Sequence, residues 1–220
     1  MFDIDGTLTD TMAVDVECYE AAIRAELGIG IPSDWPTFDE VTDASILATA
    51  CERRGIPVPG EETQRGIAEE VGRRLESELA RAPHRFRAVP GAPEIFEVLR
   101  SAGWRVAMAT GAWRPSALVK LRGAGIPHEG VPLASASEHP ARAEIIRTAV
   151  QATSGSREEP VVYLGDGVWD GKAAKSLGYG FVGVATEGQG DRLRDAGADV
   201  VIEDFSEARA LIDALGRWLR

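Results

Sequence analysis

Two aspartates, Asp3 and Asp5, lie two residues apart in the opening sequence MFDIDGTLTD. Clustered carboxylates repel one another, so a cation is needed to hold them together. One carboxylate can act as a nucleophile toward a phosphoryl group, and a second one nearby can protonate the leaving group and then activate water. The Gly6 turn that follows would free backbone N–H groups to face phosphate oxygens. This stretch therefore predicts a site for phosphoryl chemistry.

Polar residues also follow two later apolar runs of the sequence. Thr110 and Gly111 end the run WRVAMAT, and Asp166 ends the run PVVYLGD, with Asp170 shortly beyond it. Ligands of open parallel sheets bind beyond the carboxyl ends of the strands, so we expect these groups to gather with the first two aspartates. A set of oxygen ligands with no His or Cys nearby suits Mg²⁺. The Thr110 hydroxyl could bind the same phosphoryl group.

Each motif taken alone has a purely structural alternative. Asp before Gly is common turn chemistry, which applies to both the Asp5-Gly6 and the Asp166-Gly167 pairs. Thr110 and Asp170 could each cap a helix that follows them. Their joint position at the ends of apolar runs favours the catalytic interpretation.

The elements that must position these residues follow from the alternation of the chain after about residue 86. Short runs rich in Val, Ile and Ala, apolar on both faces, are separated by longer amphipathic stretches, which predicts a parallel sheet covered by helices. FDI at the start is interpreted as the end of one more strand. The runs span residues 104–110, 160–166, 179–186 and 198–204, and the stretches include residues 91–103, 114–125, 141–153 and 170–178.

Residues 13–85 follow a different pattern. Apolar residues recur at helical spacing within 13–29, 39–56 and 61–82, prolines punctuate the connections, and no convincing strand is found. We therefore predict an α/β fold, a Rossmann-like parallel sheet core interrupted after its first strand by an all-helical insertion. The expected domains are residues 1–12 and 86–220 for the core and 13–85 for the insertion.

Composition limits the possible partners. The 220 residues carry a net charge of −11, which disfavours nucleic acid and anionic membranes and tolerates bound divalent cations. Cys18 and Cys51 form no CxxC pattern, so we expect two reduced thiols. No signal peptide or membrane-spanning run is evident. We expect a cytoplasmic monomer or homodimer that acts on a small molecule, with no nucleic acid or membrane partner.

The motifs resemble those of the haloacid dehalogenase (HAD) superfamily, in its phosphatase-like branch. FDIDGTLTD resembles the first motif, VAMATGA the second and VVYLGDGVWD the fourth. The resemblance covers essentially the whole chain, and it identifies residues 13–85 as similar to the helical cap that many members carry. Phosphoglycolate phosphatase-like enzymes are the nearest named type.

This resemblance implies roles for the acidic residues. Asp3 would be the nucleophile and Asp5 the general acid and base. Mg²⁺ would be held by the Asp3 carboxylate, the main-chain carbonyl of Asp5 and the Asp166 carboxylate. Asp170 would support the metal site directly or through water.

The resemblance also implies the groups that bind the phosphoryl moiety. Thr110 and the N–H of Gly111 would do so, together with a basic residue of the third motif, which is usually Lys. No Lys lies between Lys120 and Lys172, so we expect Arg142 to take that place, with Arg147 as the alternative. Arg neutralises phosphate more rigidly than Lys does.

Comparison among branches of the superfamily favours hydrolysis of a small phosphomonoester. Dehalogenating members lack the second aspartate, whereas Asp5 is present here. Phosphonoacetaldehyde hydrolases need a cap lysine, and residues 13–85 contain none. A sugar phosphomutase (β-phosphoglucomutase-like) and a nucleotide pyrophosphatase remain alternatives. A non-catalytic binding protein is disfavoured because Asp3, Asp5 and Asp166 are all retained.

The cap should select the substrate. Thr42 and Asp43, in EVTDASIL, are candidate substrate contacts, although either could simply cap a helix. Trp113 and Trp169 could wall the pocket or pack at the sheet edge. The arginines of the cap could meet an anionic substrate or be solvated; these are Arg53, Arg54, Arg65, Arg73 and Arg74.

The first strand is expected to be unusually short. Only Met1 and Phe2 precede Asp3, whereas a strand typically has about five or six residues. Either this strand is short, or a few native residues precede Met1.

Overall fold

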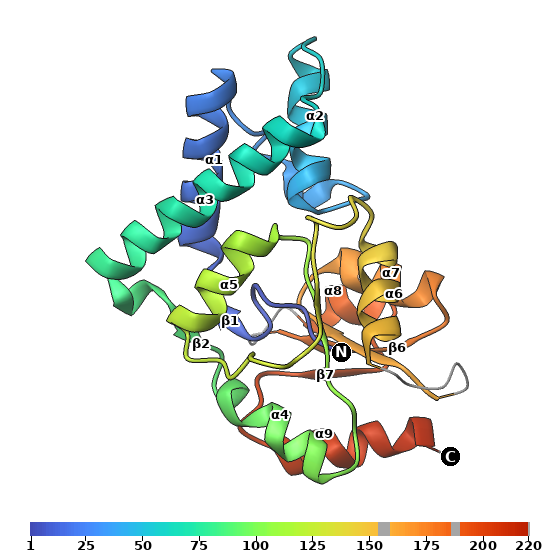
Figure 1. Ribbon diagram of the computed structural model, residues 1–220. Helices are drawn as coiled ribbons and strands as arrows, with labels where there is room; N and C mark the ends of the chain where they lie inside the picture. Colours follow the sequence, from blue (N-terminus) through green and yellow to red (C-terminus); the bar gives the residue numbers. More distant parts are fainter. Residues whose placement is uncertain (154–158, 186–189, 220) are drawn as a thin grey trace.

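The computed structural model describes residues 1–153, 159–185 and 190–219, and its core is a parallel sheet (Figure 1). Phe2 forms parallel bridges to Met108 and Leu164, so the first residues lie between two neighbouring strands. Strand β3 (Met108–Ala109) pairs with β4 (Leu133–Ala134), and β5 (Val162–Gly165) pairs with β6 (Gly180–Val184), which pairs with β7 (Val200–Ile202). The strand order is β4, β3, the Phe2 segment, β5, β6 and β7, which confirms the predicted α/β core. Thr186, the last residue of the predicted run 179–186, lies outside the described residues.

Backbone hydrogen bonds fix the short first segment from both sides. The N–H of Phe2 donates to the carbonyl of Ala107 at 3.0 Å, and the Phe2 carbonyl accepts from Ala109 at 2.9 Å. On the other side the N–H of Asp3 donates to the Leu164 carbonyl at 2.9 Å. The expected short strand is therefore held in the middle of the sheet, and Asp3 stands at its carboxyl end.

Helices cover both faces of the sheet, as the apolar runs predicted. Tyr163 and Phe181 belong to one buried cluster, and Val162, Leu164 and Val182 belong to the other, because alternate strand residues face opposite sides. The first face carries α6 (Arg142–Ala152) and α7 (Val168–Ser176), and the second carries α4 (Ala92–Ser101) and α9 (Ala208–Leu215). The remaining core helices are α5 (Arg114–Gly123) and α8 (Gly190–Asp195), with a 3-10 turn at Gly216–Leu219.

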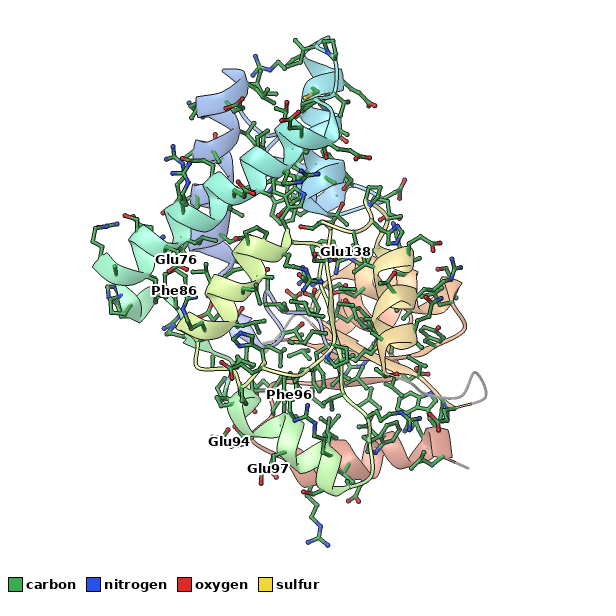
Figure 2. All side chains as sticks on the ribbon, viewed as in Figure 1. Glu76, Phe86, Glu94, Phe96, Glu97 and Glu138 are labelled. Atoms are coloured by element: carbon green, nitrogen blue, oxygen red, sulfur yellow. The ribbon has the colours of Figure 1, made fainter. Side chains whose placement is uncertain are left out.

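Helix α4 illustrates why these stretches form covering helices. In Figure 2, Phe96 faces the sheet while Glu94 and Glu97 lie on the outer side of the helix. The buried Phe96 ring packs against Phe2 at a centroid distance of 5.2 Å. The apolar face of the helix thus stabilises the segment that carries Asp3.

The helical insertion contains three long helices, drawn at the top of Figure 1. They are α1 (Met12–Leu27), α2 (Asp43–Arg53) and α3 (Glu61–Arg81), with 3-10 turns at Trp35–Thr37 and Pro83–Arg85. Residues 12–86, all of them described, contain no strand, as the sequence predicted. Cys18 and Cys51 are buried free thiols, also as predicted. Within the described part of the chain, no helix has both the length and the apolar composition needed to cross a membrane.

Two structural features were not predicted. Strands β1 (Thr9–Asp10) and β2 (Arg87–Ala88) pair antiparallel where the chain leaves and re-enters the core. Strand β4 was also missed. Each of these strands has two residues, too few to produce an apolar run, and their partners lie far away in the sequence.

Candidate active site

Three carboxylates converge at the carboxyl edge of the sheet. Asp3 follows the first segment, Asp166 follows β5, and Asp170 lies in the first turn of α7. Oxygen atoms of the three side chains lie within 4.8 Å of one another. The acidic residues expected from separate parts of the sequence therefore meet, because parallel strands end at the same edge.

Arg142, the first residue of α6, extends into this acidic cluster. Its Nη1 donates to Asp170 Oδ1 at 2.9 Å and to Asp3 Oδ1 at 3.2 Å. Its Nη2 donates to the carbonyl of Val41 at 2.7 Å, and the side chain is 6% exposed. Burial alone would lower the pKa of Arg142, but the charges of Asp170 and Asp3 outweigh it and raise the pKa. The guanidinium is thus a fixed positive charge beside Asp3.

Tyr163 contacts Arg142 within the core, whereas Arg147, the other basic candidate, lies at the surface. The Tyr163 hydroxyl donates to the carbonyl of Ala109 at 2.8 Å and lies 3.4 Å from Arg142 Nη1. Tyr163 was not predicted, although it interrupts the otherwise aliphatic run PVVYLGD with a polar group. Arg147, the alternative to Arg142, pairs with Glu144 at the surface and is 49% exposed.

The electrostatics of the carboxylates favour a bound cation. Burial, followed by the charge of Asp170, raises the pKa of Asp3 well above its usual range. The same two causes raise the pKa of Asp166 to about 8. Asp166 Oδ1 is buried and has no hydrogen-bond partner within the described residues. Three clustered buried carboxyl groups beside the Arg142 guanidinium, together with an unpartnered carboxylate oxygen, fit a hard divalent cation such as Mg²⁺.

The backbone of Gly6 closes a turn and does not present its own N–H to a phosphate. Its N–H donates to the carbonyl of Thr9 at 2.8 Å, so it closes the turn and does not face a phosphate. Its φ of +72° suits glycine, and a Cβ at this position would overlap the carboxylate of Asp166. The turn needs glycine because Asp166 packs against it.

Thr110 and Gly111 line the same cavity as Asp3 and Arg142. The Thr110 hydroxyl, 1% exposed by residue, accepts a hydrogen bond from the N–H of Ala112 at 3.2 Å. A Cβ on Gly111 would overlap the guanidinium of Arg142, so only glycine allows this close approach. The structure therefore brings these two residues beside Asp3, as the sequence predicted.

Asp5 is held by a lysine that the sequence analysis missed. Lys120 of α5 is fully buried, and its Nζ donates to Asp5 Oδ2 at 2.5 Å and lies 3.1 Å from Asp15 Oδ2. Asp5 Oδ1 accepts a hydrogen bond from Thr11 at 3.0 Å. Burial alone would lower the pKa of Lys120, but Asp15 and Asp5 raise it. A signal existed, because Lys120 lies three residues after the apolar Ala117 and therefore on the same face of its helix.

Two aspartates of the insertion complete this side of the site. Burial raises the pKa of Asp15 to about 6 against the opposing effect of Lys120. Burial, followed by the charge of Asp15, raises the pKa of Asp43 to about 8. Asp43 Oδ2 accepts a hydrogen bond from the N–H of Trp113 at 2.7 Å. Asp15, on α1, was missed by the sequence analysis because an aspartate in a helix usually lies at the surface.

The expected substrate contacts have mixed positions. Thr42 caps α2 by accepting from the N–H of Ser45 at 3.1 Å, and like Asp43 it lines the cavity. Its capping role and its place at the cavity are thus compatible. Trp113 is 2% exposed and packs on Tyr19 with ring centroids 5.5 Å apart, so its side chain lies behind the cavity wall.

The cavity lies between the helical insertion and the core. Its volume is about 60 Å³, and it is lined by residues of α1 and α2 on one side and by the strand-end loops on the other. Trp35 of the insertion and Trp169 of the core both line it, with ring centroids 6.1 Å apart. The cap arginines lie elsewhere: Arg53 pairs with Asp34 and Arg73 with Glu70 on the outer surface.

The fold and the site together define a class of protein. An α/β sheet with a helical insertion after its first strand, and an acidic cluster at the strand ends, is a ligand-binding arrangement of the open parallel type. The family model for haloacid dehalogenase-like hydrolases matches residues 1–178. The chain therefore belongs to the haloacid dehalogenase-like hydrolase family, as its motifs predicted.

Solved structures share this fold at low sequence identity. A hydrolase from Pseudomonas syringae has a TM-score of 0.75 at 22% identity, covering 97% of both chains. A putative β-phosphoglucomutase from Bacteroides vulgatus has a TM-score of 0.70 at 19% identity, covering 100% of this chain and 88% of that one. A predicted phosphoglycolate phosphatase from Haemophilus somnus has a TM-score of 0.60 at 18% identity, covering 96% and 95%. No functionally curated protein matches the sequence significantly.

Proposed function

We propose that the protein is a Mg²⁺-dependent phosphatase that hydrolyses a small phosphomonoester through an aspartyl phosphate on Asp3. One observation carries this proposal. Asp3 and Asp5 line one cavity but have different surroundings, since Asp3 lies beside Arg142 and Asp5 is held by Lys120 and Thr11. Arg142 and a bound cation would keep Asp3 ionised for attack, while Lys120 and Thr11 hold Asp5 in place as the group that passes protons.

Binding of the phosphoryl group would use residues already in place. The Arg142 guanidinium, the Thr110 hydroxyl and the N–H of Gly111 would bind its oxygens. Mg²⁺ would be held by the carboxylates of Asp3, Asp166 and Asp170 and by the main-chain carbonyl of Asp5. When bound, Mg²⁺ supplies positive charge that neutralises the carboxylates and the phosphoryl oxygens.

The reaction would then proceed in two steps. A carboxylate oxygen of Asp3 bonds to phosphorus while the bond to the alcohol oxygen breaks, and Asp5 gives that oxygen a proton. Next, water bonds to phosphorus and passes a proton to Asp5, while the bond between phosphorus and Asp3 breaks. Phosphate leaves, and the Asp3 carboxylate and the protonated Asp5 are restored.

Residues 13–85 would act as a cap on the core formed by 1–12 and 86–220. The cavity of about 60 Å³ lies between cap and core, so we expect the cap to move when a phosphomonoester enters. Closure would exclude bulk water from the site. Thr42 and Asp43 would then lie against the leaving group.

A sugar phosphomutase is the second candidate. It would use the same carboxylates, and the covered cavity would protect the aspartyl phosphate from water. The Bacteroides vulgatus neighbour is described as a putative β-phosphoglucomutase.

The test compares phosphate release from p-nitrophenyl phosphate with and without Mg²⁺. We expect Mg²⁺-dependent turnover, which Asp3→Asn lowers by at least about a thousand-fold because the nucleophile is lost. Asp10→Asn is the matched control, since Asp10 is exposed and pairs with Arg87 at the surface. Full activity of Asp3→Asn would refute the mechanism. Isomerisation of a hexose phosphate without phosphate release, followed by ³¹P NMR, would instead indicate the mutase.

A further inference from the structure

A residue of the helical insertion that lines the cavity has an unpartnered carboxylate oxygen. Asp15 on α1 lines the cavity and is 7% exposed. Lys120 Nζ lies 3.1 Å from its Oδ2, whereas its Oδ1 is buried and has no hydrogen-bond partner within the described residues. A buried acceptor without a donor is costly and uncommon in folded proteins. Because the Asp15 side chain lines the cavity, its Oδ1 is suited to accept a hydrogen bond from a ligand.

The charge of the cavity wall limits what that ligand can be. The insertion contributes two carboxylates to it, those of Asp15 and Asp43, and its other lining residues are uncharged. Among the lining residues, Arg142 is the basic one, and it stands beside Asp3 at the phosphoryl end. Lys120 lies behind the wall, engaged with acidic partners. A second anionic group on the substrate would therefore meet acidic side chains and, among the described lining residues, no cation besides Arg142.

Aromatic rings line the same cavity. Trp35 and Trp169 line the cavity with ring centroids 6.1 Å apart. Indole faces attract cations through the quadrupole of the ring, and this attraction strengthens where water is excluded. Carboxylates and indole rings in one cavity together favour an ammonium group over an anion.

We infer that Asp15 is a specificity-determining residue whose Oδ1 accepts a hydrogen bond from the leaving group. The substrate is then a small phosphomonoester whose alcohol carries a hydrogen-bond donor, an ammonium group in preference to a hydroxyl, and no second phosphate or carboxylate. This inference rests on the proposed phosphatase function and narrows it. Phosphoglycolate, whose alcohol carries a carboxylate, becomes a poor substrate.

Four esters of nearly equal size test the inference with the wild-type enzyme and Mg²⁺. They are 2-aminoethyl phosphate, 2-hydroxyethyl phosphate, ethyl phosphate and phosphoglycolate, compared by kcat/KM. We expect values in that order, with 2-aminoethyl phosphate above ethyl phosphate by about ten- to a hundred-fold, the worth of one hydrogen bond to a charged group. A higher value for phosphoglycolate than for 2-aminoethyl phosphate would overturn the inference.

A variant then assigns the selectivity to one residue. Asp15→Asn should bring kcat/KM for 2-aminoethyl phosphate to within about threefold of kcat/KM for ethyl phosphate, because the charge that the ammonium group meets is gone. Glu26→Gln is the matched control, since it removes the same charge from an exposed position of α1, and its ratio should equal that of wild type. General damage to the site would instead lower kcat/KM for both esters by the same factor and leave their ratio unchanged. An unchanged ratio in Asp15→Asn would contradict the assignment.

Binding without turnover separates this inference from the proposed function. In the Asp3→Asn protein, thermal unfolding with each ester reports binding directly. We expect 2-aminoethyl phosphate to raise Tm more than phosphoglycolate does, and the reverse order would refute the substrate class. If no ester, p-nitrophenyl phosphate included, is turned over by the wild type, the phosphatase proposal fails, while this order of Tm still decides which ligand the cavity accepts.

Discussion

Replacing Lys120 with Met tests the buried charge network at its centre. The ammonium group is fully buried, 2.5 Å from Asp5 Oδ2 and 3.1 Å from Asp15 Oδ2. Methionine has a similar length and no charge, so Lys120→Met leaves two buried carboxylates without their cation. Breaking a buried pair in this way costs about 3–5 kcal/mol. For a chain of this size, each kcal/mol lowers Tm by about 2–4 °C, so we expect a loss of about 6–20 °C.

The loss of stability should depend on pH. The pKa of Asp15 is raised to about 6 by burial even with Lys120 present, and removing the lysine raises it further. A carboxyl group with a raised pKa stabilises the fold fully below its unfolded value, near 4, and this contribution is lost as pH rises through the folded pKa. The amount by which Tm of Lys120→Met falls below that of wild type should therefore be smaller at about pH 5 than at about pH 8.

The assay is thermal unfolding in EDTA at both pH values. Lys172→Met is the matched control, because Lys172 is 55% exposed and pairs with Asp39 at the surface, so little change is expected. The double variant Lys120→Met/Asp15→Asn should recover part of the loss, since one unpaired carboxylate is removed. A Tm for Lys120→Met within about 2 °C of wild type, or a deficit independent of pH, would refute the reasoning.

Three further predictions concern the acidic cluster. The pKa of Asp166 is raised to about 8, so its protonated form stabilises the metal-free fold, and this contribution is lost as pH rises from about 4 through 8. Mg²⁺ should therefore raise Tm more at about pH 8.5 than at about pH 6. Equal shifts of Tm at the two pH values would contradict this. Gly6→Ala should lower Tm and activity because a Cβ at this position overlaps the Asp166 carboxylate. Gly66→Ala, in open space on α3, is the control and should lower neither. A Gly6→Ala protein with the Tm of wild type would count against the close approach of Gly6 and Asp166. Arg142→Lys should lower kcat/KM for p-nitrophenyl phosphate about ten- to a hundred-fold, since the Lys ammonium cannot reproduce the planar, forked donors of the guanidinium. Arg147→Lys, at the surface, should leave kcat/KM unchanged. A fully active Arg142→Lys protein would argue against phosphate binding by Arg142.

The main part of the site could be predicted from sequence because of the fold class. Asp3, Thr110 and Asp166 each follow an apolar run, and runs of a parallel sheet end at one edge. Arg142 was expected from the family resemblance, in the place of the Lys of the third motif, and the structure places it 3.2 Å from Asp3. Local pattern and a common edge were sufficient for the strand-end residues, since each of them lies next to the strand end that positions it.

Turn and packing details could not be predicted in the same way. The turn at Gly6 was expected to free backbone N–H groups for a phosphate, but the Gly6 N–H itself bonds to Thr9 because the chain folds back into β1. Trp113 was expected beside the substrate as one alternative, but Tyr19 of the insertion covers it. Both outcomes depend on contacts with β1 or α1 that no local motif specifies.

The sequence by itself determined the α/β core, the helical insertion and the acidic edge, because periodicity and strand-end residues are local properties. Only the tertiary structure decided the environment of Asp5. Lys120 lies 115 residues from Asp5 in the chain, and it is buried because α5 packs beneath the insertion. A charged residue on a helix is usually solvated, so its burial appears only when the facing helix supplies an acidic partner, here Asp15 on α1.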